Sequence, residues 1–268
     1  KHAPLSVSGG FSIFPGGVAP GPTNSTVYQL ADDISMVRGP HQIGFGVNYV
    51  KTQLNYGATL NADGGFSFTA QQTGLGLGDF TLGKARQFQQ TLSEMQYYRR
   101  ESIGLYLQDT WKTTPRLTLN GGLRWEPSLP ITEKRDKALI FDRAAFDQGI
   151  RSKVYKNAPP GLQFPGDAGM PDSSLYPARL LKFAPRLGLG WDPSGDGRMT
   201  IRAAYGIYFD FPHFQQFALA KDDPPWGNSV VIANPLGGFA DPWQGYAGGS
   251  PFPVVITSNI AFPVSGIY

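Results

Sequence analysis

The stretch from Gly104 to Glu126, GLYLQDTWKTTPRLTLNGGLRWE, contains the pattern that decides the fold class. From residue 116 onward, polar and apolar positions alternate. The apolar set consists of Leu117, Leu119, Gly121, Leu123 and Trp125. The polar set consists of Arg116, Thr118, Asn120, Gly122, Arg124 and Glu126. Successive side chains of a β-strand point to opposite faces, so this alternation predicts a strand with one apolar and one polar face.

The residues just before this strand alternate in the same way. Between 101 and 111, the positions that share the apolar face are Ile103, Leu105, Leu107 and Trp111. Asp109 interrupts this apolar face, and Tyr106 interrupts the polar one. The connection Thr113-Thr114-Pro115 is short and made of turn-forming residues. The two segments are therefore predicted to form an antiparallel hairpin.

The period of two recurs in four more segments, at 27–37, 42–50, 186–192 and 199–210. Short connections at 38–40 and 193–197, both with glycine and proline, join them in pairs. The sequence thus predicts a single partial barrel domain over 1–268, with hairpins near 27–50, 99–127 and 183–210. Long loops are predicted near 55–98, 128–182 and 211–268. If all short turns lie at one end of a sheet, all long loops lie at the other.

This asymmetry is typical of outer-membrane barrels, which have short periplasmic turns, long extracellular loops and strands of roughly 9–11 residues. We therefore predict an all-β fold: an antiparallel up-and-down transmembrane β-barrel segment of about six strands with long extracellular loops. Such a protein lies in the bacterial outer membrane, with lipid as its first partner. The alternative is a soluble β-sandwich, in which the apolar face is the core.

Aromatic residues on the apolar face fit the membrane prediction. Barrels carry aromatic girdles at both membrane interfaces. Trp111 and Trp191 lie near the short turns, and Tyr49, Trp125 and Phe209 lie near the long-loop ends. These five residues are predicted membrane-interface aromatics. In a soluble sandwich they would be ordinary core residues.

The polar face carries charged residues that we expect to face the barrel lumen: Arg124, Glu126, Arg186 and Arg202. They either line a substrate path or bond to a plug and to one another. In the long loops, exposed aromatics near carboxylates could stack on an external ligand, and the candidates are Trp226, Trp243 and Tyr246. The alternative is that these aromatics hold the loops together.

Composition excludes several other classes. Glycine and proline account for 34 and 23 of the 268 residues, which argues against a mainly helical protein. An apolar fraction of 41% and an aromatic fraction of 13% argue against disorder. The 23 basic and 20 acidic residues are too balanced to predict a nucleic-acid partner. Cysteine is absent, which excludes disulfides and thiolate chemistry.

The ends of the sequence predict no targeting segment. The chain opens Lys1-His2-Ala3-Pro4, without an initiating methionine or an apolar signal region. No apolar run is long enough for a transmembrane helix. We therefore expect either that a signal has been removed or that the chain is an internal piece of a longer protein.

No catalytic or metal-binding pattern stands out. His2, His41 and His213 are far apart, without carboxylates at ligand spacing, so no metal site is predicted. The glycine-rich stretch 74–78 lacks the strand–helix context of a phosphate loop and is predicted to be a flexible external loop. The charged run 133–137 is predicted to be a solvated loop. We expect no enzyme activity and no cofactor.

Four motifs resemble TonB-dependent outer-membrane receptors. The hairpin at 104–126 closely resembles their YxQDxWxxTxxLTLNxGLRxE motif. FAPRLGLGWDP at 183–193, followed by IRAAYGIYFD at 201–210, is similar to a later hairpin of these barrels. VRGPHQIGFG at 37–46 and GDFTLG at 78–83 also match. Together they resemble the large Oar-like branch, whose members carry a carboxypeptidase-regulatory-like domain before the plug.

The resemblance implies a receptor that binds a scarce external ligand in its loops and plug and imports it with energy from the TonB complex. It also implies partners outside this sequence: a plug domain of the same full-length chain, and the TonB complex through an N-terminal part. Neither the plug nor a TonB box is visible here. The family barrel has about 22 strands, so about six strands would be a central slice. The alternatives are an outer-membrane adhesion or assembly barrel without transport, and a soluble β-sandwich carbohydrate-binding module.

Overall fold

A computed structural model describes residues 3–14 and 21–262. Its main sheet contains six long strands in the spatial order β13-β12-β8-β7-β4-β3, and every neighbouring pair is antiparallel. The strands are β3 (Thr23–Arg38), β4 (His41–Tyr56), β7 (Gln96–Thr114), β8 (Leu117–Trp125), β12 (Phe183–Trp191) and β13 (Ile201–Gly206). A two-residue strand, β9 (Thr132–Glu133), also pairs with β7. The long strands follow one another in sequence order, which is the predicted up-and-down arrangement.

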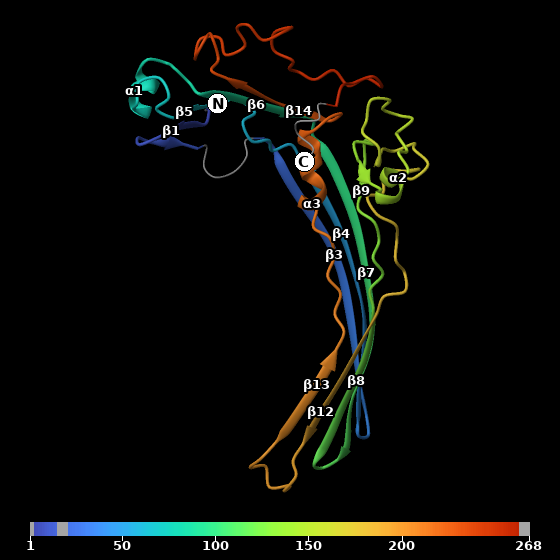
Figure 1. Ribbon diagram of the computed structural model, residues 1–268. Helices are drawn as coiled ribbons and strands as arrows, with labels where there is room; N and C mark the ends of the chain where they lie inside the picture. The colour runs from blue at the N-terminus through green and yellow to red at the C-terminus, as the bar shows by residue number, and fades with distance from the viewer. Residues whose placement is uncertain (1–2, 15–20, 263–268) are drawn as a thin grey trace.

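The sheet is tall, curved and open (Figure 1). Among the described residues, β3 and β13 form its two edges and do not pair with each other. The three short turns lie at one end, and the long connections gather at the other (Figure 1). This is the predicted distribution of turns and loops.

Local side chains and glycine stabilise the short turns. Gly39 has a φ of +59°, which a two-residue hairpin turn requires and glycine adopts without strain. In the second turn, the Thr114 hydroxyl accepts hydrogen bonds from the backbone N–H groups of Arg116 and Leu117, at 3.2 and 3.0 Å. In the third, the Asp192 carboxylate accepts backbone hydrogen bonds from residues 195 and 197.

Three strands are longer than predicted. β3 and β4 each have 16 residues and β7 has 19, whereas β8 and β12 have 9. At about 3.3 Å per residue and a tilt of about 40°, a 16-residue strand rises roughly 40 Å, well beyond the apolar band of about 25 Å. The upper ends of β3, β4 and β7 therefore extend above the expected membrane zone.

One strand is shorter than predicted. The alternation at 199–210 predicted a strand through Phe209, but β13 ends at Gly206. The last bond to β12 runs from the Ile207 N–H to the Pro185 carbonyl, at 3.0 Å. Pro185 has no N–H to return, so the ladder stops there. Phe209 consequently lies in an extended segment beyond the strand.

The two faces of the sheet separate as the alternation predicts. One rung of the apolar face runs across four strands, through Ile34, Phe45, Leu107 and Leu123. These side chains are 43–58% exposed, and no second sheet formed by the described residues covers them. A soluble sandwich would bury this face as its core. An uncovered apolar face is what lipid contact requires, so the sandwich alternative is wrong.

The break at Asp109 in the apolar face has a structural explanation. The Asp109 carboxylate lies 2.6 Å from Nδ1 of His41, on the neighbouring strand. The His41 ring in turn stacks on Trp111, with ring centroids 5.4 Å apart. The carboxylate is therefore paired, close to the short-turn end of the sheet.

The long connections contain a second sheet of five strands, in the order β14-β6-β5-β1-β2. Its strands are β1 (Leu5–Val7), β2 (Ser12–Ile13), β5 (Gly65–Phe68), β6 (Gln87–Ser93) and β14 (Gly227–Ala233). All neighbours are antiparallel except β1 and β5, which are parallel. This sheet lies across the loop end of the main sheet (Figure 1), and we call it, with the loops packed around it, the cap.

Short elements complete the cap. The strands β10 (Ile140–Phe141) and β11 (Leu162–Gln163) pair, and the helices are α1 (Gly76–Thr81), α2 (Arg143–Asp147), α3 (Gln215–Ala218) and a 3₁₀ helix, η1 (Leu219–Asp222). Three apolar clusters hold these elements together, centred on Tyr98, Phe68 and Phe164. The long loops therefore form packed structure with its own cores.

One loop prediction was wrong, and a second holds only in part. The stretch 74–78 runs into α1, where Asp79 is 1% exposed and accepts hydrogen bonds from the backbone N–H and hydroxyl of Thr73, both at 2.8 Å. The run 133–137 is a turn whose residues 134–136 are exposed, as predicted, but Glu133 is 1% exposed. Its carboxylate accepts backbone hydrogen bonds from residues 97, 135 and 137. In both cases backbone N–H groups take the place of water around the carboxylate. The carboxylate in turn accepts hydrogen bonds from N–H groups that the loop would otherwise bury without a partner.

Within residues 3–14 and 21–262, no helix has the length and apolar character needed to cross a membrane.

The assignment of faces predicts the effect of charge at two adjacent positions. Leu107→Arg places a cation on the apolar face, midway between the interface residues Trp111 and Tyr49, and should lower the free energy of unfolding by about 2–4 kcal/mol. Gln108→Arg places the same cation on the polar face and should cost much less. Urea unfolding of the full-length protein in lipid vesicles measures both values. Equal losses would contradict the assigned faces.

Candidate functional site

The concave, polar face of the main sheet carries a hydrogen-bonded rung built across a glycine. Asp33, Gly46, Tyr106 and Arg124 are register partners on β3, β4, β7 and β8. The Tyr106 hydroxyl donates to the Asp33 carboxylate at 2.6 Å and passes over Gly46 to reach it. A Cβ at position 46 would overlap both side chains. Tyr106, which breaks the polar alternation in the sequence, thus joins strands on that face.

The predicted lumen residues lie on this face. The Arg124 guanidinium forms an ion pair with Glu126 and lies over Gly104, where a side chain would collide with it. Arg186 lies above the Tyr208 ring, with 4.7 Å between its Cζ atom and the ring centroid. Arg124 and Arg186 both line a cavity of about 170 Å³.

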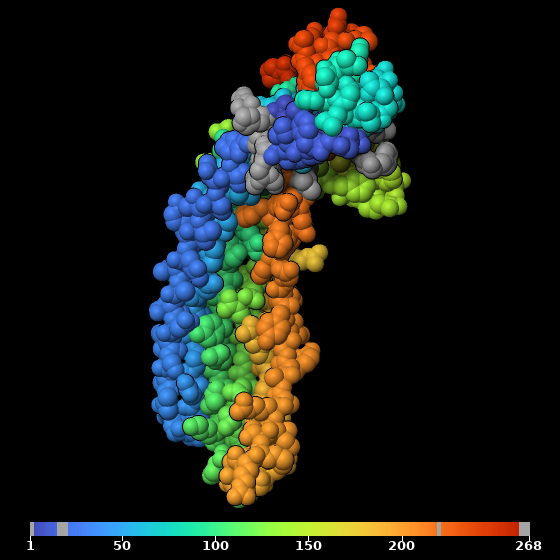
Figure 2. All heavy atoms as spheres, turned by 90° about the vertical axis from the view of Figure 1, so that its left-hand side faces the viewer, coloured from blue at the N-terminus to red at the C-terminus, as the bar shows by residue number. Residues whose placement is uncertain are grey.

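Arg202 stands apart from this group. It pairs in register with Gly190, is exposed, and forms no ion pair within the described part of the chain. Figure 2 shows the sheet with β3 and β4 along one side and β13 with its following segment along the other. Arg124, Glu126 and Arg186 therefore form one polar patch on the wall, and Arg202 lies nearer the short turns. Their roles toward a substrate or a plug stay predictions.

The predicted interface aromatics occupy both ends of the apolar face. Trp111 and Trp191 are 40% and 45% exposed at the short-turn end. Tyr49 and Trp125 lie on the same face farther up, and the Trp125 indole N–H donates to the Leu180 carbonyl at 2.7 Å. Phe209 lies beyond β13, where the Lys182 ammonium is 4.9 Å from its ring centroid.

The loop aromatics divide into two groups. Trp226 is 5% exposed and packs against Tyr155 and Phe164, so it joins two long loops and is not available to an external ligand. Trp243 and Tyr246 pack edge to face, with centroids 5.2 Å apart, and Tyr246 is 37% exposed. Burial thus favours the structural alternative for Trp226, while Trp243 and Tyr246 stay candidates for ligand contact.

A buried cation that no sequence pattern predicted joins the first and last long loops. Lys221 is 1% exposed. Its ammonium donates to the hydroxyls of Thr59 and Ser93, at 2.9 and 3.0 Å, and forms an ion pair with Asp222. An isolated buried ammonium is costly, and these three oxygens satisfy it. The cluster fixes the loop after β13 to the loop after β4.

The folded structure disfavours the charged form of the neighbouring Asp223 carboxyl. Burial raises the pKa of its carboxyl, and the charge of Asp222 raises the pKa further. At the mouth of the sheet, burial also raises the pKa of the Tyr98 hydroxyl, with a further contribution from the Glu133 charge. The tyrosine hydroxyl lies within hydrogen-bonding distance of two acceptors, the Gln96 side-chain oxygen and the Phe217 carbonyl. Burial within the packed loops therefore accounts for the raised pKa values of Asp223 and Tyr98.

The histidines do not come together. His41 pairs with Asp109 near the short turns, His213 lies just before α3, and His2 lies outside the described residues. In the chain that the structure describes, no group of three or more His, Asp or Glu side chains could hold a metal ion.

A side chain at position 46 should break the hydrogen bond from Tyr106 to Asp33 that crosses Gly46. Gly46→Ala adds a Cβ that overlaps Asp33 and Tyr106, so we expect a loss of about 1–3 kcal/mol in the free energy of unfolding. At Gly190, on the same face, an added Cβ meets no atom within 4 Å, so Gly190→Ala should be neutral or slightly stabilising. Urea titration of the full-length protein in vesicles compares them. Similar losses at both positions would disprove the role given to Gly46.

The raised pKa of Asp223 predicts a pH dependence of cap stability. When the pKa of a carboxyl is higher in the folded state than its ordinary value of about 3.9, protonation of that carboxyl stabilises the folded state. This stabilisation is complete below a pH of about 3.9 and is lost as the pH rises through the folded-state pKa. Asp223→Asn should therefore slow proteolysis of the cap at neutral pH, and the difference should shrink as pH falls toward 4. Asp147→Asn, at an exposed ion pair on α2, is the matched control. No slowing at neutral pH would refute the prediction.

Comparison with known proteins agrees with this geometry. A family model described as an outer membrane beta barrel domain matches residues 2–267. No curated protein and no solved structure matches the chain. This match places the chain in the bacterial outer membrane, where barrels turn their apolar face to lipid, their short turns to the periplasm and their long loops outward. On its sequence match and its open antiparallel wall, the chain belongs to the outer membrane beta barrel domain family.

Proposed function

We propose that the chain is a wall segment of a TonB-dependent receptor that imports an external ligand. The observation that carries the proposal is the hairpin of β7 and β8, which combines the receptor-like motif with a lumen face bearing Tyr106 and Arg124. In this role the strands are scaffold and the cap recognises the ligand. We propose binding and transport, and no catalysis.

The lumen face supports a plugged barrel. Asp33 and Tyr106 are hydrogen-bonded to each other on this face, and Arg186 lines the cavity beside Arg124. A plug domain could form further hydrogen bonds with these polar side chains. The sheet spans six long strands, fewer than the eight of the smallest membrane barrels. Further strands and the plug would come from other parts of a full-length protein.

The second candidate is an adhesion or assembly barrel without a transport cycle. The observation that favours it is the compactness of the cap, whose long loops share apolar cores and a buried cation. A rigid external surface suits adhesion as well as ligand recognition. The two candidates differ in whether the lumen holds a plug that responds to energy.

A cross-linking experiment separates the two. A photo-reactive residue at Gln108, on the lumen face, is introduced into the full-length protein in its native membrane. A receptor should give a cross-link to a plug of the same chain. Collapsing the inner-membrane proton gradient with a protonophore should change the yield, because the TonB complex then no longer pulls on the plug.

Leu107 is the matched control, because it is adjacent in sequence, 58% exposed and on the lipid face. It should cross-link to lipid only and ignore the protonophore. Absence of a plug cross-link at Gln108, or a yield that does not respond to the protonophore, would exclude the receptor and favour the adhesion barrel.

A further inference from the structure

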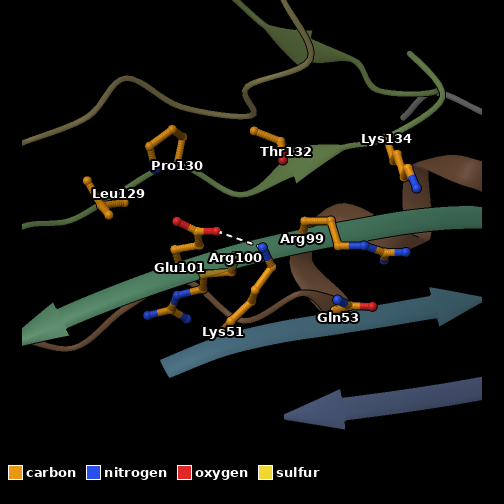
Figure 3. A pocket seen from close by; sticks show the side chains of 9 residues that line it. All are labelled: Lys51, Gln53, Arg99, Arg100, Glu101, Leu129, Pro130, Thr132 and Lys134. Carbon is orange, nitrogen blue, oxygen red and sulfur yellow. Dashed lines mark ion pairs between the residues drawn. The ribbon is translucent and has the colours of Figure 1, made fainter. Parts of the chain in front are cut away.

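A basic pocket opens on the outer side of the wall, just above the apolar band. It has a volume of about 540 Å³ and lies between β4, β7 and the chain around β9 (Figure 3). Three cationic side chains and a single carboxylate face it, an excess of two positive charges: Lys51, Arg99, Lys134 and Glu101. Arg100 also borders the pocket but points to the other face of β7, where it donates to the Pro212 carbonyl at 3.3 Å and lies over the Phe211 ring. Nothing in the proposed transport role uses this site.

Strand register shows which way these side chains face. Lys51 is the partner of Glu101, and the rung two residues below is Tyr49 with Ile103, on the lipid face. Side chains two residues apart on a strand share a face. Lys51 and Glu101 therefore point outward, toward the membrane surface and away from the lumen.

The same rungs fix the depth of the pocket. On the outer face, residues change from apolar at 103–107 to aromatic at Tyr49 and then to charged at Lys51. Interfacial aromatic residues mark the level of the headgroups. The charged rung lies one step above, on the side of the long extracellular loops, where the phosphates of outer-leaflet lipids lie.

The pocket lies where the strand pairing along one side of β7 is interrupted. β7 pairs with β8 only up to the Leu105–Trp125 pair, and with β9 from the Arg99–Thr132 pair onward. Between these ladders, residues 126–131 bend away from β7. Leu129 and Pro130 line the far side, so the pocket combines an apolar wall with a basic floor, which suits the junction of an acyl chain and a phosphate.

The cationic side chains are held in place by neighbouring residues but keep N–H groups that can donate to a ligand. The Lys51 ammonium is 3.0 Å from the Glu101 carboxylate, and both side chains are 40–47% exposed (Figure 3). The Arg99 guanidinium donates to Asn55 at 3.1 Å through one nitrogen. Lys134 forms no side-chain hydrogen bond or ion pair within residues 3–14 and 21–262. Arginine and lysine with free donors are the groups that bind phosphate.

We propose that this pocket binds the phosphate of an outer-leaflet anionic lipid, of the lipid A class, and so anchors the extracellular edge of the wall. Basic pockets at headgroup depth bind anionic headgroups, at about 1 kcal/mol for each Lys or Arg near the surface. A free phosphate ion would use the basic floor but not the apolar wall.

The test measures binding of bisphosphorylated lipid A to the full-length protein in phosphatidylcholine nanodiscs. Lys51→Gln combined with Lys134→Gln should weaken binding about thirtyfold, since two charges are lost. Glu101→Gln should tighten binding about fivefold, because it removes the competing carboxylate. Lipid A without phosphates should bind the parent and both variants equally.

The control removes two charges elsewhere, through Arg143→Gln and Arg198→Gln, whose side chains are 77% and 89% exposed on α2 and the third short turn. This control should bind lipid A like the parent. Unchanged mobility on heating in detergent shows that each variant is folded. The proposal is overturned if the pocket variant binds like the parent, if the control loses as much, if Glu101→Gln weakens binding, or if inorganic phosphate alone binds as tightly as the lipid.

Discussion

Hydrogen bonding of the backbone in lipid is the constraint on which the whole molecule depends. No water is available in the hydrocarbon to satisfy N–H and C=O groups, so a spanning strand must pair on both sides and turn an apolar face outward. The rung Ile34–Phe45–Leu107–Leu123 meets the second demand, and the ladders of β4, β7, β8 and β12 meet the first. Within the apolar band, polar side chains are consequently confined to the lumen face, apart from the paired Asp109 and His41 near the short turns.

This constraint explains which features the sequence could predict. A strand in lipid repeats every two residues, so the faces of β7, β8 and β12 follow from their apolar positions alone. Turn chemistry is equally local, as the role of Asp192 shows. The full length of β7 was missed because Arg99, Arg100 and Glu101 interrupt the apolar pattern just where the strand leaves the membrane and no longer needs it.

The cap could not be predicted, because its partners are distant in sequence. β14 pairs with β6 through backbone groups, and such pairing leaves little mark on side-chain order. The burial of Lys221 depends on hydroxyls from two other segments, and that of Trp226 on a third loop. At the candidate site, Arg124, Glu126 and Arg186 share one face, as the alternation predicts, and their role in the lumen stays a prediction. The link from Tyr106 to Asp33 depends on register between strands that are not neighbours.

The unbroken ladder between β4 and β7 has a mechanical consequence. All sixteen residues of β4 pair with β7 without a shift in register, from the short turn to the base of the cap. On the other side, pairing stops at Gly206, and an extended segment continues upward to α3. The cap is therefore joined to the wall by a continuous backbone ladder at β4 and β7, and by an unpaired segment at residues 207–214 that side-chain contacts, such as Arg100 over the Phe211 ring, hold against β7. The backbone hydrogen bonds of β4 and β7 consequently couple the cap directly to the membrane-spanning part of the sheet.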